Sequence, residues 1–515
     1  PNVLPGSVAQ NSPTAATPPA ARDYVPYSAE GMNVASGAHL RHAAAPETPA
    51  KETTHLVEKQ PELCSRLWSS FCLVMTSGAG LFADGYDLLV IDLVVADISH
   101  LYPGAMGPRE KSFSVSMCLL GVIVGQLSFG TVADIVGAKV ASMVTAFLIA
   151  VAAILSACVV QSPGFPLALQ LGLCRFFLGL GVGGEYPVSA ALAVEGHGSA
   201  AGAQTDAFYG SRPQLQVLVA GMFNLGSVLT GAVVLALLHS GMALEGVWRW
   251  ALGLGAAPAL LALCARACLP SSESPSSRSA SGRSHPGWNG YCGRFLSSVG
   301  PRRMTLLGAC LSWAIFNVTM YGQGSFRSII SDRIYGSSAG KSVYSVVHKS
   351  AVFSLSMSLC TLGGTVLAVI LVDRLRRFQQ QLLGFGTSAV CMWVCGALLG
   401  CLPDSLDWLL ALCNYLWVVL YIQVSVTTYL IPAECFPAPA RATCFGIAAA
   451  SGKLGALIGT SLFPVCEAAF GLEAVLVASG FVSLVGALAT VLLTPRVNVD
   501  PAKLDAECSK EDSPS

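Results

Sequence analysis

The residues with the clearest chemical meaning are two charges inside an apolar run, Arg175 and Glu185. Tyr186 directly follows Glu185. Burying either charge in hydrocarbon is expensive, so such residues mark a polar path. Ten residues of helix place the two charges about 15 Å apart, too far for a simple ion pair. We expect Glu185 to be a proton carrier or coupling acid and Tyr186 to donate its hydroxyl to a substrate oxygen. Arg175 either shares this role or is a structural pin that bonds neighbouring backbone.

A pair of aspartates, Asp84 and Asp87, lies in the first apolar run. Their spacing of three places both side chains on one face of a helix. Two carboxylates in hydrocarbon do not both ionise comfortably, so one of them can carry a proton. The pair therefore favours proton coupling, and the alternative is that one aspartate caps or bonds a neighbouring helix.

Three polar-tipped side chains, Trp313, Asn317 and Tyr321, follow one another at intervals of four residues. Each step turns a helix face by only about 40°, so the three form one stripe. An interfacial aromatic belt explains Trp or Tyr near a helix end but not an asparagine between them. The stripe predicts the wall of a cavity.

The last third of the chain adds hydroxyls and charges. Ser425 and Thr428 have hydroxyls that can bond an oxyanion, whereas Glu434 and Arg441, close to two prolines, shape and pin a helix end. Lys453 lies about a third of the way into a helix. It either extends its ammonium group to the membrane interface or supplies positive charge to an anion.

The composition sets the class of protein. The 515 residues are 53% hydrophobic and 11% charged, with a mean hydropathy of +0.62, whereas soluble domains carry about 25% charged residues. The chain is therefore predicted to cross a membrane many times. Its formal net charge of zero implies no nucleic-acid partner. The 18 cysteines show no metal-ligand spacing, and we expect neither a metal nor a cofactor.

About twelve apolar runs are long enough to span a bilayer as helices. We place them at 68–97, 112–134, 140–161, 166–194, 215–240, 247–269, 304–327, 346–372, 379–402, 406–431, 441–466 and 471–494. They form an N-terminal half at 68–269 and a C-terminal half at 304–495, joined by a polar linker at 270–303. Residues 1–60 and 496–515 are predicted to be disordered tails.

A short internal repeat supports two six-helix halves. Asp134 and then Lys139 follow the second run, and Asp373 and then Arg374 follow the eighth. Most arginines and lysines in the loops lie on the same side of the membrane as these turns. The positive-inside rule assigns this side, with both termini, to the cytoplasm. The basic residues that fall on the other side of the membrane, against this assignment, are Arg109, Lys111, Arg327, Arg333, Lys341 and Lys349. We expect a multi-pass protein of the plasma membrane.

These motifs together resemble the phosphate:proton symporters of the major facilitator superfamily, found in fungi and plants. The resemblance rests on Asp84-Gly85-Tyr86-Asp87, on Gly183-Gly184-Glu185-Tyr186-Pro187, and on the residues from Pro432 to Lys453. It implies an all-α fold of about twelve transmembrane helices in two halves. It also implies that Tyr186, Trp313 and Tyr321 hold the substrate. The chain departs from the pattern at Asn317 and Ser425, where the family has aspartate and asparagine, and Asn224 lies near the position of a family glutamine.

The resemblance implies proton-coupled phosphate symport by alternating access. Its partners are then a small anion, protons and the bilayer, and the protein is expected to be a monomer and not an enzyme. Because Asn317 is neutral, a glycerophosphodiester or another organophosphate is the second expectation. A sugar or polyol porter is a third, faintly suggested by Glu273-Ser274-Pro275. A nutrient sensor that does not transport is a fourth.

Overall fold

A computed structural model describes residues 50–106, 108–200, 212–268, 288–323, 330–332, 336, 342–401 and 407–511. The residues from Gln60 onward form one compact unit. Glu273-Ser274-Pro275 and the loop residues Arg327, Arg333 and Lys341 lie outside the described part of the chain.

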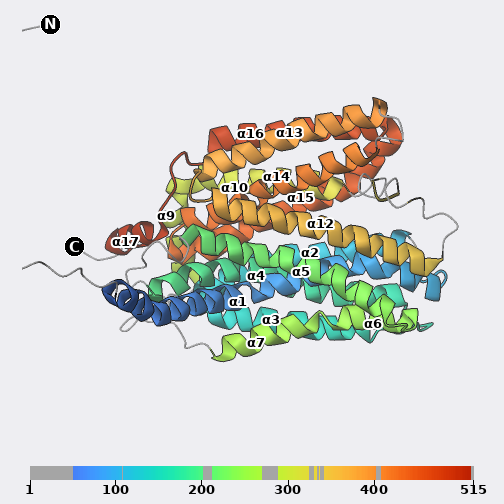
Figure 1. Cartoon of the computed structure of the whole chain (residues 1–515), viewed down its shortest axis with the longest axis horizontal. Helices are drawn as coiled ribbons and strands as arrows, with labels where there is room; N and C mark the ends of the chain where they lie inside the picture. The colour runs from blue at the N-terminus through green and yellow to red at the C-terminus, as the bar shows by residue number, and fades with distance from the viewer. Residues whose placement is uncertain are drawn as a thin grey trace, which may run out of the picture. The chain divides into compact units, whose positions relative to one another are not determined.

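The described residues form long helices because their apolar runs leave no other way to pair backbone groups in hydrocarbon. The first half contains α1 (Ala50–Leu101), α2 (Pro108–Val136), α3 (Ala138–Ala157), α4 (Leu167–Ala200), α5 (Arg212–His239), α6 (Leu244–Gly253) and α7 (Ala256–Cys268). The second contains α10 (Arg303–Gly322), α12 (Val343–Leu371), α13 (Arg377–Cys401), α14 (Asp407–Cys435), α15 (Arg441–Phe470) and α16 (Leu472–Leu493). In Figure 1 the two halves lie side by side.

These elements confirm the predicted helices with one change. Eleven spans in the described residues are long and apolar enough to cross a membrane, and α1 occupies the place of the first predicted helix. The sixth predicted helix is interrupted, because α6 ends at Gly253 and α7 begins at Ala256. The interruption matters for the site described below.

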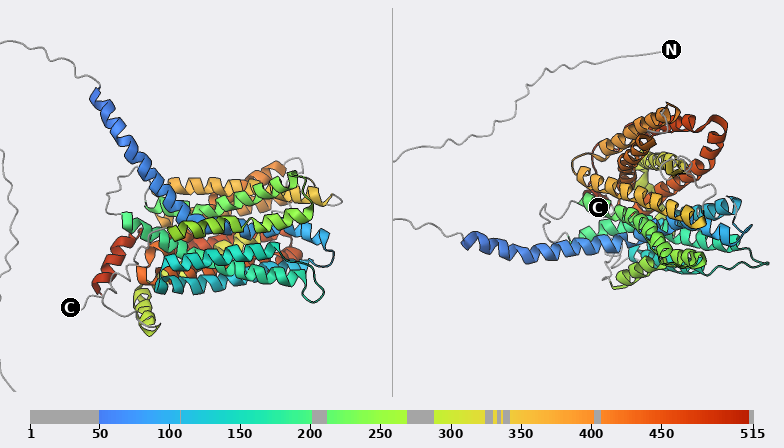
Figure 2. Two further views of the ribbon diagram at one scale, coloured as in Figure 1. Left: turned by 90° about the horizontal axis from the view of Figure 1, so that it is seen from below. Right: turned by 45° about the vertical axis from the view of Figure 1, so that its right-hand side comes forward.

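Both predicted tails need correction where the structure describes them. Helix α1 begins at Ala50, within the predicted tail of 1–60. Helix α17 (Pro501–Glu511) occupies part of the predicted C-terminal tail. Composition gave no sign of α17, because it is held by a distant partner. Asp505 accepts hydrogen bonds of 2.8 and 2.9 Å from Arg441. Figure 2 shows α17 beyond one end of the bundle, near α9 (Trp288–Val299).

Glycines of α4 allow unusually close packing within the first half. A Cβ atom placed on Gly179 or Gly183 would lie 2.2 or 2.1 Å from a backbone oxygen of α2, those of Cys118 and Val122. On the other face of α4, a Cβ on Gly181 would lie 2.9 Å from the Thr145 backbone oxygen of α3. The alternating glycines therefore allow close contact between neighbouring helices.

Two pairs of helices form the most extensive contacts between the two halves. Helix α2 packs against α15, where a Cβ on Gly446 would lie 2.1 Å from the Gln126 backbone oxygen. Helix α5 packs against α12, where Asn224 Nδ2 donates to Thr365 Oγ1 at 2.8 Å. We call these the α2–α15 contact and the α5–α12 contact. A relative movement of the halves must change both of them.

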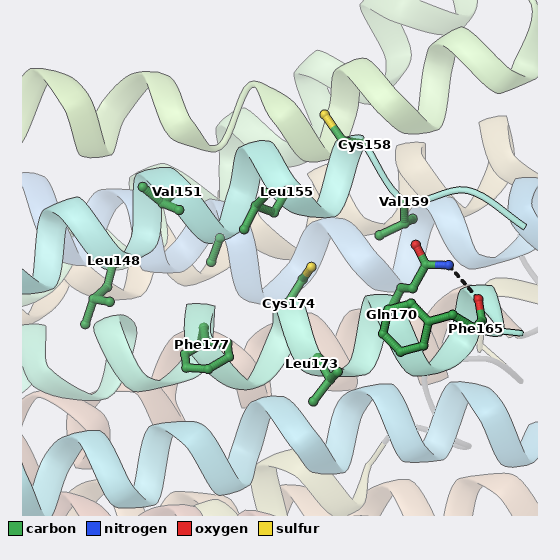
Figure 3. A pocket seen from close by; sticks show the side chains of 11 residues that line it. Leu148, Val151, Leu155, Cys158, Val159, Phe165, Gln170, Leu173, Cys174 and Phe177 are labelled. Atoms are coloured by element: carbon green, nitrogen blue, oxygen red, sulfur yellow. Dashed lines mark hydrogen bonds between the residues drawn. The ribbon is translucent and has the colours of Figure 1, made fainter. Parts of the chain in front are cut away.

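An apolar groove between α3 and α4 opens on the outer surface of the bundle (Figure 3). Its walls include Val151, Leu155 and Phe177, which are exposed hydrophobic side chains suited to lipid chains. Its one amide, that of Gln170, donates to the backbone oxygens of Phe165 and Val160. With no charged side chain in its lining, this groove is not a candidate for proton or anion chemistry.

The glycine packing of α4 yields a stability prediction. Replacing Gly183 by Val places atoms inside the contact distance of α2, and such overpacking costs roughly 1–3 kcal/mol. We expect a lower unfolding temperature in detergent, measured by intrinsic tryptophan fluorescence. The matched control is Gly363→Ala, because a Cβ on Gly363 meets nothing within 4 Å. An unchanged unfolding temperature for Gly183→Val would refute the close packing.

Candidate functional site

A cation surrounded by aromatic rings joins the two halves. Lys453 Nζ on α15 lies 5.5 Å from the ring centre of Tyr186 on α4 and 5.4 Å from that of Tyr321 on α10. It also donates to the Tyr321 hydroxyl at 3.3 Å. The ring of Tyr186 lies 6.4 Å from that of Trp313 on α10. Three substrate-binding residues expected from the sequence therefore meet around Lys453.

Lys453 is 5% exposed, which argues against extension of its ammonium group to the membrane interface; its expected role toward an anion stays a prediction. Extension to the membrane interface would leave its ammonium group exposed, whereas the structure holds it inside the bundle. Asn317 joins the same cluster, because a Cβ on the adjacent Gly452 would lie 2.8 Å from Asn317 Nδ2 and 2.5 Å from Trp313. Gly452 thus allows the stripe of α10 to reach α15 beside the lysine.

Tyr429 on α14 is a member of this site that the sequence reasoning did not select. Its ring packs 5.0 Å from Phe445, which in turn lies 5.4 Å from Trp313. Its hydroxyl is buried, has no hydrogen-bond partner among the described residues, and lies within electrostatic reach of Tyr186 and Glu185. Its sequence signal was its place directly after Thr428 in a hydroxyl-rich run.

Thr428 and Ser425 behave differently from Tyr429. The Thr428 hydroxyl is buried and donates to the Ser425 backbone oxygen at 2.9 Å. Ser425 is half-buried, and no described contact joins either residue to Lys453. Asn224 is likewise committed elsewhere, to Thr365 in the α5–α12 contact. The expected substrate roles of Ser425 and Thr428 stay predictions.

Glu185 forms a buried ion pair with Arg266 of α7. Arg266 Nη1 and Nη2 donate to the two carboxylate oxygens at 2.8 Å each. The guanidinium also bonds the backbone oxygens of Ser142 and Thr76 at 2.9 and 3.3 Å, and Thr145 donates to the carboxylate. This two-point pairing fixes Glu185 in place. Arg266 was not among the residues predicted from the sequence, although an arginine inside the sixth apolar run is a signal of a buried charge.

Asp84 and Asp87 are buried carboxyl groups without such support. Neither accepts a hydrogen bond from the described residues. Asp84 lies within electrostatic reach of Glu185, Lys453 and Arg266. Leaving an unpaired carboxylate in such a place costs several kcal/mol, which uptake of a proton removes.

The carboxyl group of Asp87 lies against the break between α6 and α7. A Cβ placed on Gly255 would lie 1.9 Å from Asp87 Oδ1, so only a glycine leaves room for this carboxyl group. Arg175 Nη1 donates to the Asp87 backbone oxygen at 2.8 Å. This bond fixes α4 to α1 beside the aspartates, as expected of a structural pin, and the role of Arg175 stays a prediction.

The remaining motif residues lie at one end of the bundle and shape it. Asp134 accepts hydrogen bonds from the Ala442 and Thr443 amides at 3.1 and 2.8 Å, so it caps α15 of the opposite half. Glu434 pairs with Arg377 through two bonds of 3.0 Å. These bonds and those of Arg441 with Asp505 are the contacts expected if Glu434 and Arg441 pin a helix end, a role that stays a prediction. Lys139 is half-buried, and Asp373 and Arg374 are exposed.

The buried charges near the centre of the bundle balance one another. We define the charged cluster as Asp84, Asp87, Glu185, Arg175, Arg266 and Lys453. It is formally neutral when every member is ionised. An anion that binds at Lys453 leaves an excess of negative charge in a medium of low dielectric constant. A proton taken up by an unpaired carboxylate restores neutrality.

Comparisons with known proteins show what the whole chain is similar to. Residues 67–460 match the family described as Major Facilitator Superfamily. The chain is 27% identical to a probable inorganic phosphate transporter 1-6 of Arabidopsis thaliana, covering 87% of this chain and 96% of that one. It is 28% identical to the inorganic phosphate transporter PHO84 of Saccharomyces cerevisiae, over 83% and 81%.

Solved structures resemble this one in fold. A proton:xylose symporter, XylE, aligns with a TM-score of 0.64 and 21% identity, over 86% of this chain and 99% of that chain. A partially occluded inward-open form of XylE from E. coli aligns with a TM-score of 0.59 and 19% identity, over 83% and 98%.

The Glu185–Arg266 pair yields a second prediction. Arg266→Met leaves Glu185 buried and unpaired, and we expect a loss of about 3–5 kcal/mol in stability, measured as a lower unfolding temperature. Adding Glu185→Leu to that variant removes the uncompensated charge and restores most of the loss. The control is Lys111→Met, whose partner Asp92 lies 3.7 Å away with both side chains about half exposed. Additive losses in the double variant would show that the pair is not coupled.

Proposed function

The chain belongs to the Major Facilitator Superfamily, and we propose that it carries inorganic phosphate together with protons across a membrane by alternating access. The fold supports secondary transport, and the relatives named above support phosphate as the substrate. The single observation that carries the proposal is the buried ammonium group of Lys453 between Tyr186 and Tyr321, where the two halves meet.

Phosphate binding follows from the donors at this point. Lys453 supplies a positive charge and up to three N–H donors, and Tyr186, Tyr321 and Tyr429 supply hydroxyls. Asn317 adds an amide donor where a carboxylate would repel the anion. Trp313 closes the site with its ring against Tyr186. Each hydrogen bond to a charged partner is worth about 1.5–3 kcal/mol, and the lysine is expected to dominate because it adds the opposite charge.

Proton coupling follows from the charged cluster. We assign the transported proton to Asp84, because its carboxyl group is buried and unpaired and lies within reach of Lys453. Asp87 is the second candidate. Glu185, which the sequence favoured for this role, has its charge compensated by Arg266, so its protonation would break a bidentate pair. When a proton enters with phosphate, the buried charge stays balanced, and transport of either alone is disfavoured.

Alternating access requires the halves to rock about the site. The bonds from the α15 amides to Asp134 close the α2–α15 contact at one end of the bundle. Opening at that end breaks these bonds, and opening at the other end separates the end of α5 from the start of α12. We place the Asp134 end and both termini in the cytoplasm, the protein in the plasma membrane, and the working unit as a monomer.

The proton site can be tested by substitution of Asp84. In proteoliposomes, Asp84→Asn is expected to abolish phosphate accumulation driven by an imposed pH gradient, because the carrier group no longer titrates. Exchange of internal for external labelled phosphate should persist, since that reaction needs no net proton movement. The control is Asp92→Asn, on the same helix but exposed. Full gradient-driven accumulation by Asp84→Asn would exclude the assignment.

The anion site can be tested at Lys453. Lys453→Met should weaken phosphate binding by roughly 10- to 100-fold, the loss expected for hydrogen bonds to a charged group. The measurement is the phosphate concentration dependence of exchange, with Lys111→Met as the control. A substrate panel of phosphate, a glycerophosphodiester and a hexose accompanies it. Competition by the hexose but not by phosphate would contradict the proposed substrate, and stronger competition by the diester would favour organophosphate transport.

A further inference from the structure

Two histidines from opposite halves meet at the end of the α5–α12 contact. The ring centres of His239, the last residue of α5, and His348, in the second turn of α12, lie 5.3 Å apart. We propose that this pair binds a transition-metal ion such as Zn²⁺ and that the bound ion inhibits transport. The inhibition rests on the proposed function above, whereas the binding does not.

The separation of the rings suits a shared metal ion. Two imidazoles that coordinate one tetrahedral Zn²⁺ at about 2.0–2.1 Å place their ring centres about 5 Å apart. The observed planes are inclined by 61°, so the rings are not stacked on each other. Small rotations about the side-chain bonds can therefore bring one nitrogen of each ring to a common point. Water would complete the coordination of the ion.

The hydrogen bonding of His239 prepares it as a ligand. Its Nδ1 lies 2.7 Å from the Leu235 backbone oxygen. A carbonyl oxygen only accepts, so Nδ1 must carry the proton, and Nε2 of the neutral ring keeps its lone pair. A ligand histidine typically donates its other ring nitrogen to such an oxygen, which fixes the tautomer and the ring orientation.

The surroundings of His348 leave its ring accessible. Tyr344, one turn earlier, stacks on it with ring centres 6.1 Å apart and planes inclined by 21°. The neighbouring ammonium group of Lys349 is turned away to Asp332 and the Gly336 backbone oxygen, so it does not compete for the site. His239 is exposed and His348 half-buried, which leaves the pair open to ions from the aqueous side.

The position of the pair explains why an ion would inhibit. Helices α2 to α5 alternate in direction, so His239 lies at the opposite end of the bundle from Asp134. One ligand belongs to each half. Opening the transport path at this end must separate α5 from α12, and a metal bound to both histidines opposes that separation. Two protein ligands predict affinity well below that of four-ligand structural zinc sites.

The test combines direct binding with transport. Isothermal titration of the purified full-length protein with ZnCl₂ measures binding, and phosphate uptake into proteoliposomes with Zn²⁺ on both sides measures inhibition. We expect His239→Ala and His348→Ala each to lose the high-affinity binding step and to raise the half-inhibitory Zn²⁺ concentration at least about tenfold. His100→Ala, at the same end of the bundle on α1, is the matched control and should change neither.

Each outcome bears on the proposal separately. Equal Zn²⁺ binding by the wild type and both histidine variants would overturn the site and would indicate binding by cysteines or other groups. Binding that depends on both histidines without inhibition of uptake would overturn the inhibitory role alone. If the wild type fails to transport phosphate, the calorimetric result still decides the metal site.

Discussion

The charge balance of the charged cluster is the constraint on which the rest of this structure depends. Three carboxyl groups and three cations lie inside a bundle whose outer surface is apolar. Glu185 and Arg266 satisfy each other directly, and Arg175 is held by the Asp87 backbone. Asp84, Asp87 and Lys453 remain without a fixed opposite partner. These three residues are therefore suited to bind and release an anion, at Lys453, and a proton, at one of the aspartates.

Close packing of the helices brings these charged side chains together. Glycines of α4 bring α2 and α3 to backbone contact, and Gly455 does the same between α15 and α10. Small residues are needed because helices in lipid associate through packing rather than through a hydrophobic driving force. The halves meet at the α2–α15 and α5–α12 contacts, and the charged cluster lies near the same boundary. A change of charge there can therefore favour one arrangement of the halves over another.

The sequence predicted the helices, and several residues that it selected for a site lie together in the structure, for physical reasons that also explain what it missed. Long apolar runs define membrane helices, and the spacing of Trp313, Asn317 and Tyr321 defines a face. The partner of Glu185 could not be predicted, because Arg266 is 81 residues away and pairing across helices leaves no local pattern. Other features also depend on tertiary structure and could not be predicted. They are the position of Tyr429, the hydrogen bond of the Thr428 hydroxyl within its own helix, and the formation of helix α17.

The central claim is that protons and phosphate move together, and the phosphate accumulation ratio at a series of imposed pH gradients tests it most directly. With the membrane potential clamped at zero, a gradient of one pH unit supplies about 1.4 kcal/mol per proton, equivalent to a tenfold ratio. The account predicts a ratio that rises about tenfold per pH unit for each coupled proton. A phosphate distribution independent of the gradient would contradict it.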